Sequence, residues 1–198
     1  MCIDLNTLLD VIKVGLGLAY LYFEYHARPA MWIVSIIMPA VGLWLFWNKG
    51  LYADCAINVY YLLIAVYGFI VWTRRTDKGK GHHKLEIKNI TPAVAVALAI
   101  TFVIAWRAMA WALATYTDST VVWLDSVTTS LSLIGMWMLA RKIVQQWLVW
   151  FVVDAVYVWL YYKKGVYFSG TLYAFYTVMA IAGYRRWRRR MIEEKTEL

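Results

Sequence analysis

Seven long apolar runs dominate the chain, and each is bounded by charged residues, glycine or proline. A bilayer core about 30 Å thick requires roughly 20 apolar residues for each helical span, and the runs have about that length. The pattern therefore predicts an all-α integral membrane protein with seven transmembrane helices. The expected spans are 5–24, 30–47, 51–72, 92–113, 119–140, 144–162 and 166–185.

The composition agrees with a membrane protein. Of the 198 residues, 63% are hydrophobic and the mean hydropathy is +0.56. Soluble domains contain only about 45–50% apolar residues. Seven spans occupy roughly 140 residues, so we expect short connections and no second, water-soluble domain.

Basic residues lie mainly on one side of the predicted bundle. Alternate connections and the C-terminus together carry 15 of the 20 lysines and arginines, whereas the opposite connections carry 3. Connections rich in lysine and arginine stay in the cytoplasm, so the N-terminus is expected outside and the C-terminus inside. The net charge of +8 is concentrated in segments beside the spans, which argues against nucleic acid as a partner.

The residue types that build metal and catalytic sites are sparse. Cys2 and Cys55 have no metal-ligand spacing, and His82 and His83 lie in a basic loop that we expect to be solvated. The chain also lacks the His-Glu-x-x-His and Gly-x-Ser-x-Gly motifs. We therefore expect no metal, no cofactor, no catalytic residue and no enzyme activity.

The chain contains an internal repeat with an offset of 115 residues. Residues 32–72 align with 147–187 without a gap, and 13 of the 41 positions are identical. The same register pairs Asp10 with Asp125, so each copy covers three spans. Four crossings separate equivalent helices, which predicts parallel repeats in a 3+1+3 arrangement. The expected parts are a three-helix repeat (1–73), a basic cytoplasmic loop (74–91), a linker helix (92–114), a second repeat (115–187) and a cytoplasmic tail (188–198).

Parallel repeats related by an axis along the membrane normal are a known transporter design, with the substrate held at the repeat interface. This predicts a small-molecule transporter in which the three-helix units rock around a central site. The alternative is a duplicated scaffold, or an assembly subunit, that transports nothing. Such a protein would show no saturable binding of a small molecule.

An ionisable residue near the middle of the sixth span marks the candidate site. Charged groups at that depth are costly and usually face a cavity, so Asp154 is expected to contact the substrate. Trp150, one turn away, offers a π face to a cationic ring, while the carboxylate supplies charge and hydrogen-bond acceptors. The pair predicts a flat, positively charged ligand. The alternative for Asp154 is a protonated or paired structural carboxylate.

Polar residues also recur along other spans. Asp54, Asn58 and Tyr61 share one face of the third span, and the repeat mates of the last two are Tyr173 and Tyr176. We expect Asn58, Tyr61, Tyr173 and Tyr176 to line the site, although ordinary helix packing would equally explain the tyrosines. Asp54, Asp125 and Arg107 are expected to serve gating or structure, with Arg107 paired to one of the intramembrane acids.

Several local strings resemble one transporter family. They are Tyr52-Ala-Asp54, Tyr67-Gly68 with Trp72, Asp-Ser-Val-Thr-Thr-Ser-Leu-Ser-Leu from Asp125, Leu139-Ala-Arg-Lys142, Trp147-Leu-Val-Trp150, Lys164-Gly-Val-Tyr167 and Gly183-Tyr-Arg-Arg-Trp187. These strings resemble sequences of the PnuC family, and the resemblance covers nearly the whole chain. The resemblance implies a bacterial inner-membrane facilitator for B-group vitamins with a SWEET-like helix arrangement and a trimeric assembly. It also implies downhill uptake followed by trapping through a cytoplasmic vitamin kinase.

The resemblance also bears on the substrate. The nicotinamide riboside branch carries Trp-x-x-x-Asn in the sixth span, at the places of Trp150 and Asp154, and glutamine at the places of Asn58 and Met136. These departures favour thiamine, the substrate of the related PnuT branch, with nicotinamide riboside as the alternative. Both vitamins are cationic and could bind a carboxylate, so the chemistry of the residues leaves the choice open.

Overall fold

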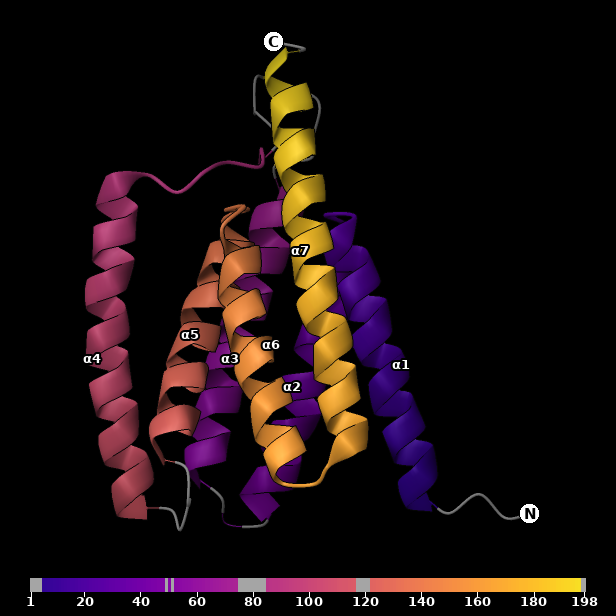
Figure 1. Cartoon of the computed structure of the whole chain (residues 1–198), viewed down its shortest axis with the longest axis vertical. Helices are drawn as coiled ribbons and strands as arrows, with labels where there is room; N and C mark the ends of the chain where they lie inside the picture. Colours follow the sequence, from indigo (N-terminus) through magenta and orange to yellow (C-terminus); the bar gives the residue numbers. More distant parts are fainter. Residues whose placement is uncertain (1–4, 49, 51, 75–84, 117–121, 197–198) are drawn as a thin grey trace. The chain divides into compact units, whose positions relative to one another are not determined.

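The computed structural model describes residues 5–48, 50, 52–74, 85–116 and 122–196, with only the backbone for 5–13, 53, 54, 74 and 116. Within these residues the chain forms seven α-helices (Figure 1), which confirms the predicted all-α class. The helices are α1 (Leu5–Tyr25), α2 (Met31–Asn48), α3 (Tyr52–Arg74), α4 (Pro92–Tyr116), α5 (Val122–Ala140), α6 (Gln146–Lys163) and α7 (Tyr167–Thr196). The chain divides into two compact units, Met1–Lys80 and Gly81–Leu198.

Four of the helices are long and apolar enough, by length and composition, to cross a membrane on their own. They are α2, α3, α4 and α5, with mean hydropathies between 1.2 and 2.0 over Met31–Asn48, Cys55–Thr73, Pro92–Thr115 and Val122–Ala140. The other helices carry more charge or more hydroxyl-bearing aromatic residues. Four apolar helices identify a multi-pass membrane protein, while the count of seven spans stays a prediction.

The second unit is built around α6. This helix packs against α5 on one side and α7 on the other, and α4 packs against α5. The contact among α4, α5 and α6 is apolar: Ile134, Met138 and Ile143 are buried in it, with Leu98 and Phe102 of α4 packed against them. In the first unit α2 likewise contacts both α1 and α3.

In each unit a buried tryptophan packs against a glycine of the next helix, from α2 to α3 in the first unit and from α6 to α7 in the second. Trp147 of α6 is 1% exposed, and a Cβ added to Gly183 of α7 would lie 2.6 Å from its indole ring. Trp187 meets the same indole edge to face, with ring centroids 5.8 Å apart and planes at 84°. In the first unit Trp32 and Gly68 approach even closer, since a Cβ on Gly68 would lie 2.4 Å from the indole. The Trp32 and Trp72 centroids are 5.6 Å apart, again with planes at 84°.

The turns on either side of the middle helix also correspond between the units. Ala27 and Lys142 both adopt left-handed backbone conformations, with φ of 51° and 53°. In each case the next amide donates to the carbonyl five residues earlier, at 2.8 Å and 3.0 Å, as in a helix C-cap. Gly50 and Gly165, which end the middle helices, have φ of 70° and 73°. Both pairs are separated by the 115-residue offset of the sequence repeat.

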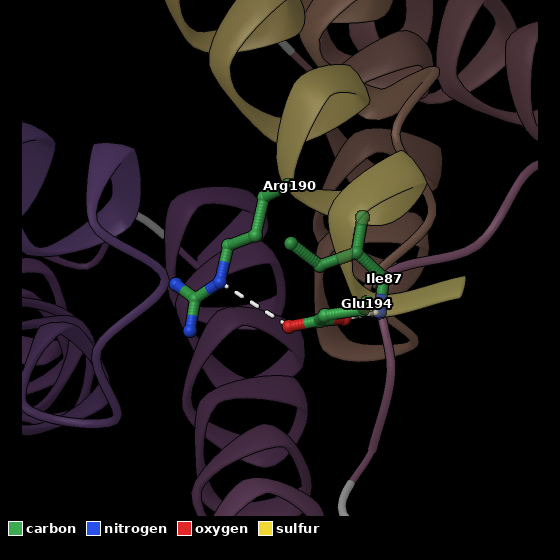
Figure 2. Close-up of polar contacts among 3 residues, drawn as sticks. All are labelled: Ile87, Arg190 and Glu194. Atoms are coloured by element: carbon green, nitrogen blue, oxygen red, sulfur yellow. Dashed lines mark hydrogen bonds and ion pairs between the residues drawn. The ribbon is translucent and has the colours of Figure 1, made fainter. Parts of the chain in front are cut away.

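The last helix is longer than the sequence pattern predicted. The expected span ended at 185 and was followed by a separate tail, but α7 continues to Thr196 beyond the ends of α5 and α6 (Figure 1). One face of the extension is packed, because Trp187 and Met191 are buried. Arg190 pairs with Glu194 one turn on, Nε to Oε1 at 3.2 Å (Figure 2). Packing and this ion pair hold a helix that hydropathy alone does not detect.

The end of the basic loop, 85–90, is an ordered part of the second unit. The Lys88 amide donates to the Lys142 carbonyl at 3.0 Å and the Lys88 carbonyl accepts from the Val144 amide at 3.0 Å, so the segment pairs with the turn between α5 and α6. The Ile87 amide donates to Glu194 of α7 at 3.5 Å (Figure 2). His82 and His83, expected in a solvated loop, lie outside the described residues.

The contact between Trp147 and Gly183 predicts a specific effect of adding one methyl group. We expect Gly183→Ala to destabilise the protein by about 1–3 kcal/mol, because the rigid, buried indole leaves no room for a Cβ. Gly15→Ala in α1 is the matched control, since a Cβ there meets nothing within 4 Å, and its effect should be neutral or slightly stabilising. Thermal unfolding in detergent measures both changes. Equal melting temperatures for the two variants would contradict the assigned role of Gly183.

Candidate functional site

Asp154 lies near the middle of α6 and is 8% exposed. Among the residues that the structure describes, no hydrogen bond or ion pair reaches its carboxylate. Burial of a charge without a partner is unfavourable, and intramembrane acids therefore tend to face an interior that supplies one. A bound ligand is one group that could supply such a partner.

Four tyrosines on α6 and α7 form an aromatic cluster beside Asp154. Tyr173 is central: its ring centroid lies 4.9 Å from that of Tyr157, 5.3 Å from that of Tyr161 and 5.8 Å from that of Tyr176. Asp154 lies within electrostatic range of the phenols of Tyr157, Tyr173 and Tyr176. The arrangement places a carboxylate among electron-rich rings, which suits a cationic, planar group.

Helical spacing and the following turn explain this cluster. Asp154, Tyr157 and Tyr161 stand at i, i+3 and i+7 on α6 and so share one face. The turn at Gly165 returns the chain, so that α6 and α7 run side by side as a hairpin (Figure 1). This brings Tyr173 of α7 opposite that face of α6.

Helix α5 contributes a hydrogen bond to the cluster. The Tyr157 side chain is hydrogen-bonded to the Thr128 side chain. The Thr128 hydroxyl also lies 2.8 Å from the Leu124 carbonyl, one turn earlier in its own helix. Ser132 likewise donates to its own helix, at 2.8 Å to the Thr128 carbonyl. The polar face of α5 is therefore satisfied mostly within the helix, with Thr128 as its link to α6.

Trp150, which lies one turn before Asp154 on α6, packs against α5. A Cβ on Gly135 would lie 3.3 Å from the Trp150 indole, so the ring rests on the α5 backbone at that glycine. Its Nε1 is buried without a hydrogen-bond partner in the described part of the chain. An unpartnered donor and an unpartnered carboxylate thus stand one turn apart on α6. Trp147, one turn before Trp150, packs against Gly183 and Trp187 of α7.

The other expected site residues lie in the first unit or outside the described side chains. Asn58 is half-buried on α3 and lies close to Gly42 of α2, where a Cβ would come within 2.6 Å of its Oδ1. Tyr61 is half-buried, with its ring 5.9 Å from that of Tyr60. The structure describes only the backbone of Asp54. A substrate contact for Asn58 or Tyr61 stays a prediction.

The expected pairing of Arg107 is not found with the acids of the second unit. Arg107 is exposed on α4, and in the described residues no ion pair joins it to Asp125 or Asp154. Helix α4 packs against α5 rather than against α6, which carries Asp154. Asp125 is half-buried at the start of α5, within electrostatic range of Tyr157.

Two members of the cluster, Tyr157 and Tyr161, were not predicted. Their spacing from Asp154 was a usable signal, because i+3 and i+7 fall on the same helix face. The internal repeat indicated site residues whose counterparts in the other copy are polar. Tyr157 has no polar counterpart, because it corresponds to Gly42. Of the four predicted residues of the second unit, the structure brings Asp154, Tyr173 and Tyr176 together, with Trp150 on the adjoining turn.

No metal centre accompanies these residues. Within the described ranges, no three side chains of histidine, cysteine, aspartate or glutamate gather closely enough to hold an ion. The side chains that meet at Asp154 supply charge, ring faces and hydrogen-bond acceptors. Such groups are suited to contact with a small organic molecule.

Apolar helices, a buried carboxylate and nearby aromatic rings are features expected of a multi-pass membrane transporter for an organic solute. Residues 7–189 match the family described as nicotinamide mononucleotide transporter. The chain therefore belongs to this family, which contains the PnuC proteins, and the resemblance inferred from the sequence is confirmed.

Individual relatives agree with this family. The chain is 27% identical over 179 residues to the riboflavin/roseoflavin transporter RibM of Streptomyces davaonensis, covering 90% of this chain and 83% of that protein. It is 24% identical over 166 residues to the nicotinamide riboside transporter PnuC of Escherichia coli, covering 72% of this chain and 69% of that protein. The crystal structure of a vitamin B3 transporter PnuC has the same fold, with a TM-score of 0.71, 17% identity, and coverage of 96% and 84% of the two chains.

The hydrogen bond between Tyr157 and Thr128 predicts energetic coupling between α6 and α5. We expect Tyr157→Phe and Thr128→Ala to be non-additive, with a coupling energy of about 0.5–1.5 kcal/mol, the range found for hydrogen bonds between membrane helices. Unfolding of both single variants and the double variant in mixed detergent completes the cycle. Strict additivity would show that the two side chains do not interact.

Proposed function

We propose that the protein is a uniporter for a cationic B-group vitamin, with thiamine as the substrate and Asp154 as the residue that binds its positive charge. The observation that supports this most directly is the buried Asp154 carboxylate beside aromatic rings, with no partner among the described residues. Family membership makes a vitamin-type solute the natural ligand. Trp150, Tyr173 and Tyr176 would enclose its ring system, and Asn58 and Tyr61 stay predicted contacts.

The chemistry of the site favours a cationic substrate over a neutral one. Thiamine carries a permanent thiazolium charge and an aminopyrimidine edge that donates to a carboxylate. Nicotinamide riboside, the alternative, is also cationic and presents a ribose diol. Riboflavin, the solute named for the Streptomyces relative, is neutral and would leave the Asp154 charge uncompensated, which is costly in a buried site.

We further propose that the two units are copies of one three-helix module joined by α4, the 3+1+3 arrangement. The corresponding tryptophan–glycine contacts and turns, all at an offset of 115 residues, support this proposal. All seven helices would then cross a bacterial inner membrane, with the C-terminus in the cytoplasm. The trimeric assembly and the cytoplasmic vitamin kinase implied by the family resemblance stay predictions.

Removal of the Asp154 charge tests the substrate proposal. We expect Asp154→Asn to weaken thiamine binding by more than tenfold, because a hydrogen bond to a charged group contributes about 1.5–3 kcal/mol. The same variant should shift the preference towards nicotinamide riboside, since it restores the Trp-x-x-x-Asn motif. Calorimetric titration of thiamine, nicotinamide riboside and riboflavin measures both effects. Unchanged thiamine affinity in a normally folded variant would reassign Asp154 to structure.

Energy coupling is tested separately. We expect proteoliposomes that contain the protein to accumulate labelled substrate up to the external concentration and no further, without any ion gradient. Imposed sodium or proton gradients should leave the initial rate unchanged to within the error of the assay. A strict requirement for either gradient would refute uniport while leaving the binding site unaffected.

A further inference from the structure

The outer face of α7, defined by Val178, Ile181, Arg185, Arg188 and Arg189, changes abruptly from apolar to basic. All five side chains are exposed. At about 100° per residue they fall within an arc of roughly 100°, so they form one continuous stripe along the helix. The same side of α7 therefore presents apolar side chains at Val178 and Ile181 and guanidinium groups from Arg185 onward.

This face cannot rotate inward, because the opposite side of α7 is fixed. Gly183 and Trp187 pack against Trp147, and Met191 is buried one turn further on. At the end of the helix Glu194 accepts from the Ile87 amide and pairs with Arg190 (Figure 2). Arg190 is thus engaged within the protein, whereas the guanidinium groups of Arg185, Arg188 and Arg189 are held facing outward.

With α7 crossing the bilayer, as the proposed function requires, the arginines stand at the depth of phospholipid phosphates. From Tyr167 to Tyr184 α7 has only aromatic, apolar, small or hydroxyl side chains, and at 1.5 Å per residue this stretch is about 27 Å long. That length matches the hydrocarbon core, so the next turn enters a headgroup layer about 5–8 Å thick on each side. Arg185, Arg188 and Arg189 occupy this turn.

We propose that the outer face of α7 binds an anionic phospholipid such as phosphatidylglycerol. Its acyl chains lie along Val178 and Ile181, and its phosphate is bound by Arg185, Arg188 and Arg189. Guanidinium groups bind phosphate oxygens in bidentate fashion, and basic residues beside a span attract anionic lipids. The unbroken continuation of an apolar stripe into a basic one favours a lipid over a soluble phosphate, which would gain nothing from Val178 and Ile181.

The test compares two double variants that remove equal charge. Arg188→Gln/Arg189→Gln lies on the outer face, and Lys163→Gln/Lys164→Gln removes two exposed charges at the opposite end of the α6–α7 hairpin. The full chain is purified in detergent and titrated with phosphatidylglycerol or phosphatidylcholine, and native mass spectrometry counts the retained lipid. We expect the arginine variant to retain phosphatidylglycerol about tenfold more weakly than the unmodified chain. The lysine variant should match the unmodified chain.

Four results would overturn the proposal, and the first three concern lipid binding. They are equal loss of phosphatidylglycerol in both variants, equal retention of phosphatidylcholine and phosphatidylglycerol by the unmodified chain, and displacement of the lipid by millimolar inorganic phosphate. A change of oligomeric state in the arginine variant in neutral lipid would also overturn it, by assigning the face to a second copy of the chain. Circular dichroism of each variant confirms that the helices persist.

Discussion

The close approach of a tryptophan ring to a glycine backbone sets the spacing of the α6–α7 hairpin, and the site depends on that spacing. Lipid chains are as apolar as the helices, so helix association in a bilayer relies on close packing at small residues. Gly183 allows Trp147 to contact the backbone of α7, and Trp187 fixes the indole from the side. The register established there brings Tyr173 against Tyr157 further along the hairpin.

The two units share this frame but differ at the positions that correspond to the tyrosine cluster. Tyr157 and Tyr173 correspond, at the 115-residue offset, to Gly42 and Asn58, which also approach each other closely. The same pair of helix positions is thus filled by two rings in one unit and by a glycine and an amide in the other. Asp154 itself corresponds to Pro39. Packing positions are retained in both units, while the carboxylate and the two rings at these positions belong to the second.

The sequence predicted the helices well because membrane insertion depends on the hydropathy that the pattern measures. Thirteen of the fourteen predicted helix ends lie within about three residues of the observed ones, the uncertainty expected of such patterns. The end of α7 was missed since its extension is stabilised by Trp187, Met191 and Glu194, contacts that hydropathy does not detect. Asp154 was singled out because a carboxylate is unusual in an apolar span, whereas the spacing of Tyr157 was a weaker signal, because a tyrosine there serves packing and binding equally well.

Hydrogen bonds fix both ends of α6 in the second unit. Gln145, just before α6, accepts from the Ile90 amide at 2.9 Å and donates to Asn89 at 3.0 Å, which ties the start of the helix to the segment before α4. The Gly165 turn fixes the other end through hydrogen bonds back to α6. A carboxylate held on a helix anchored at both ends keeps its position when no ligand is present. For the proposed role of Asp154, such preorganisation would lower the cost of binding, since little would remain to be ordered.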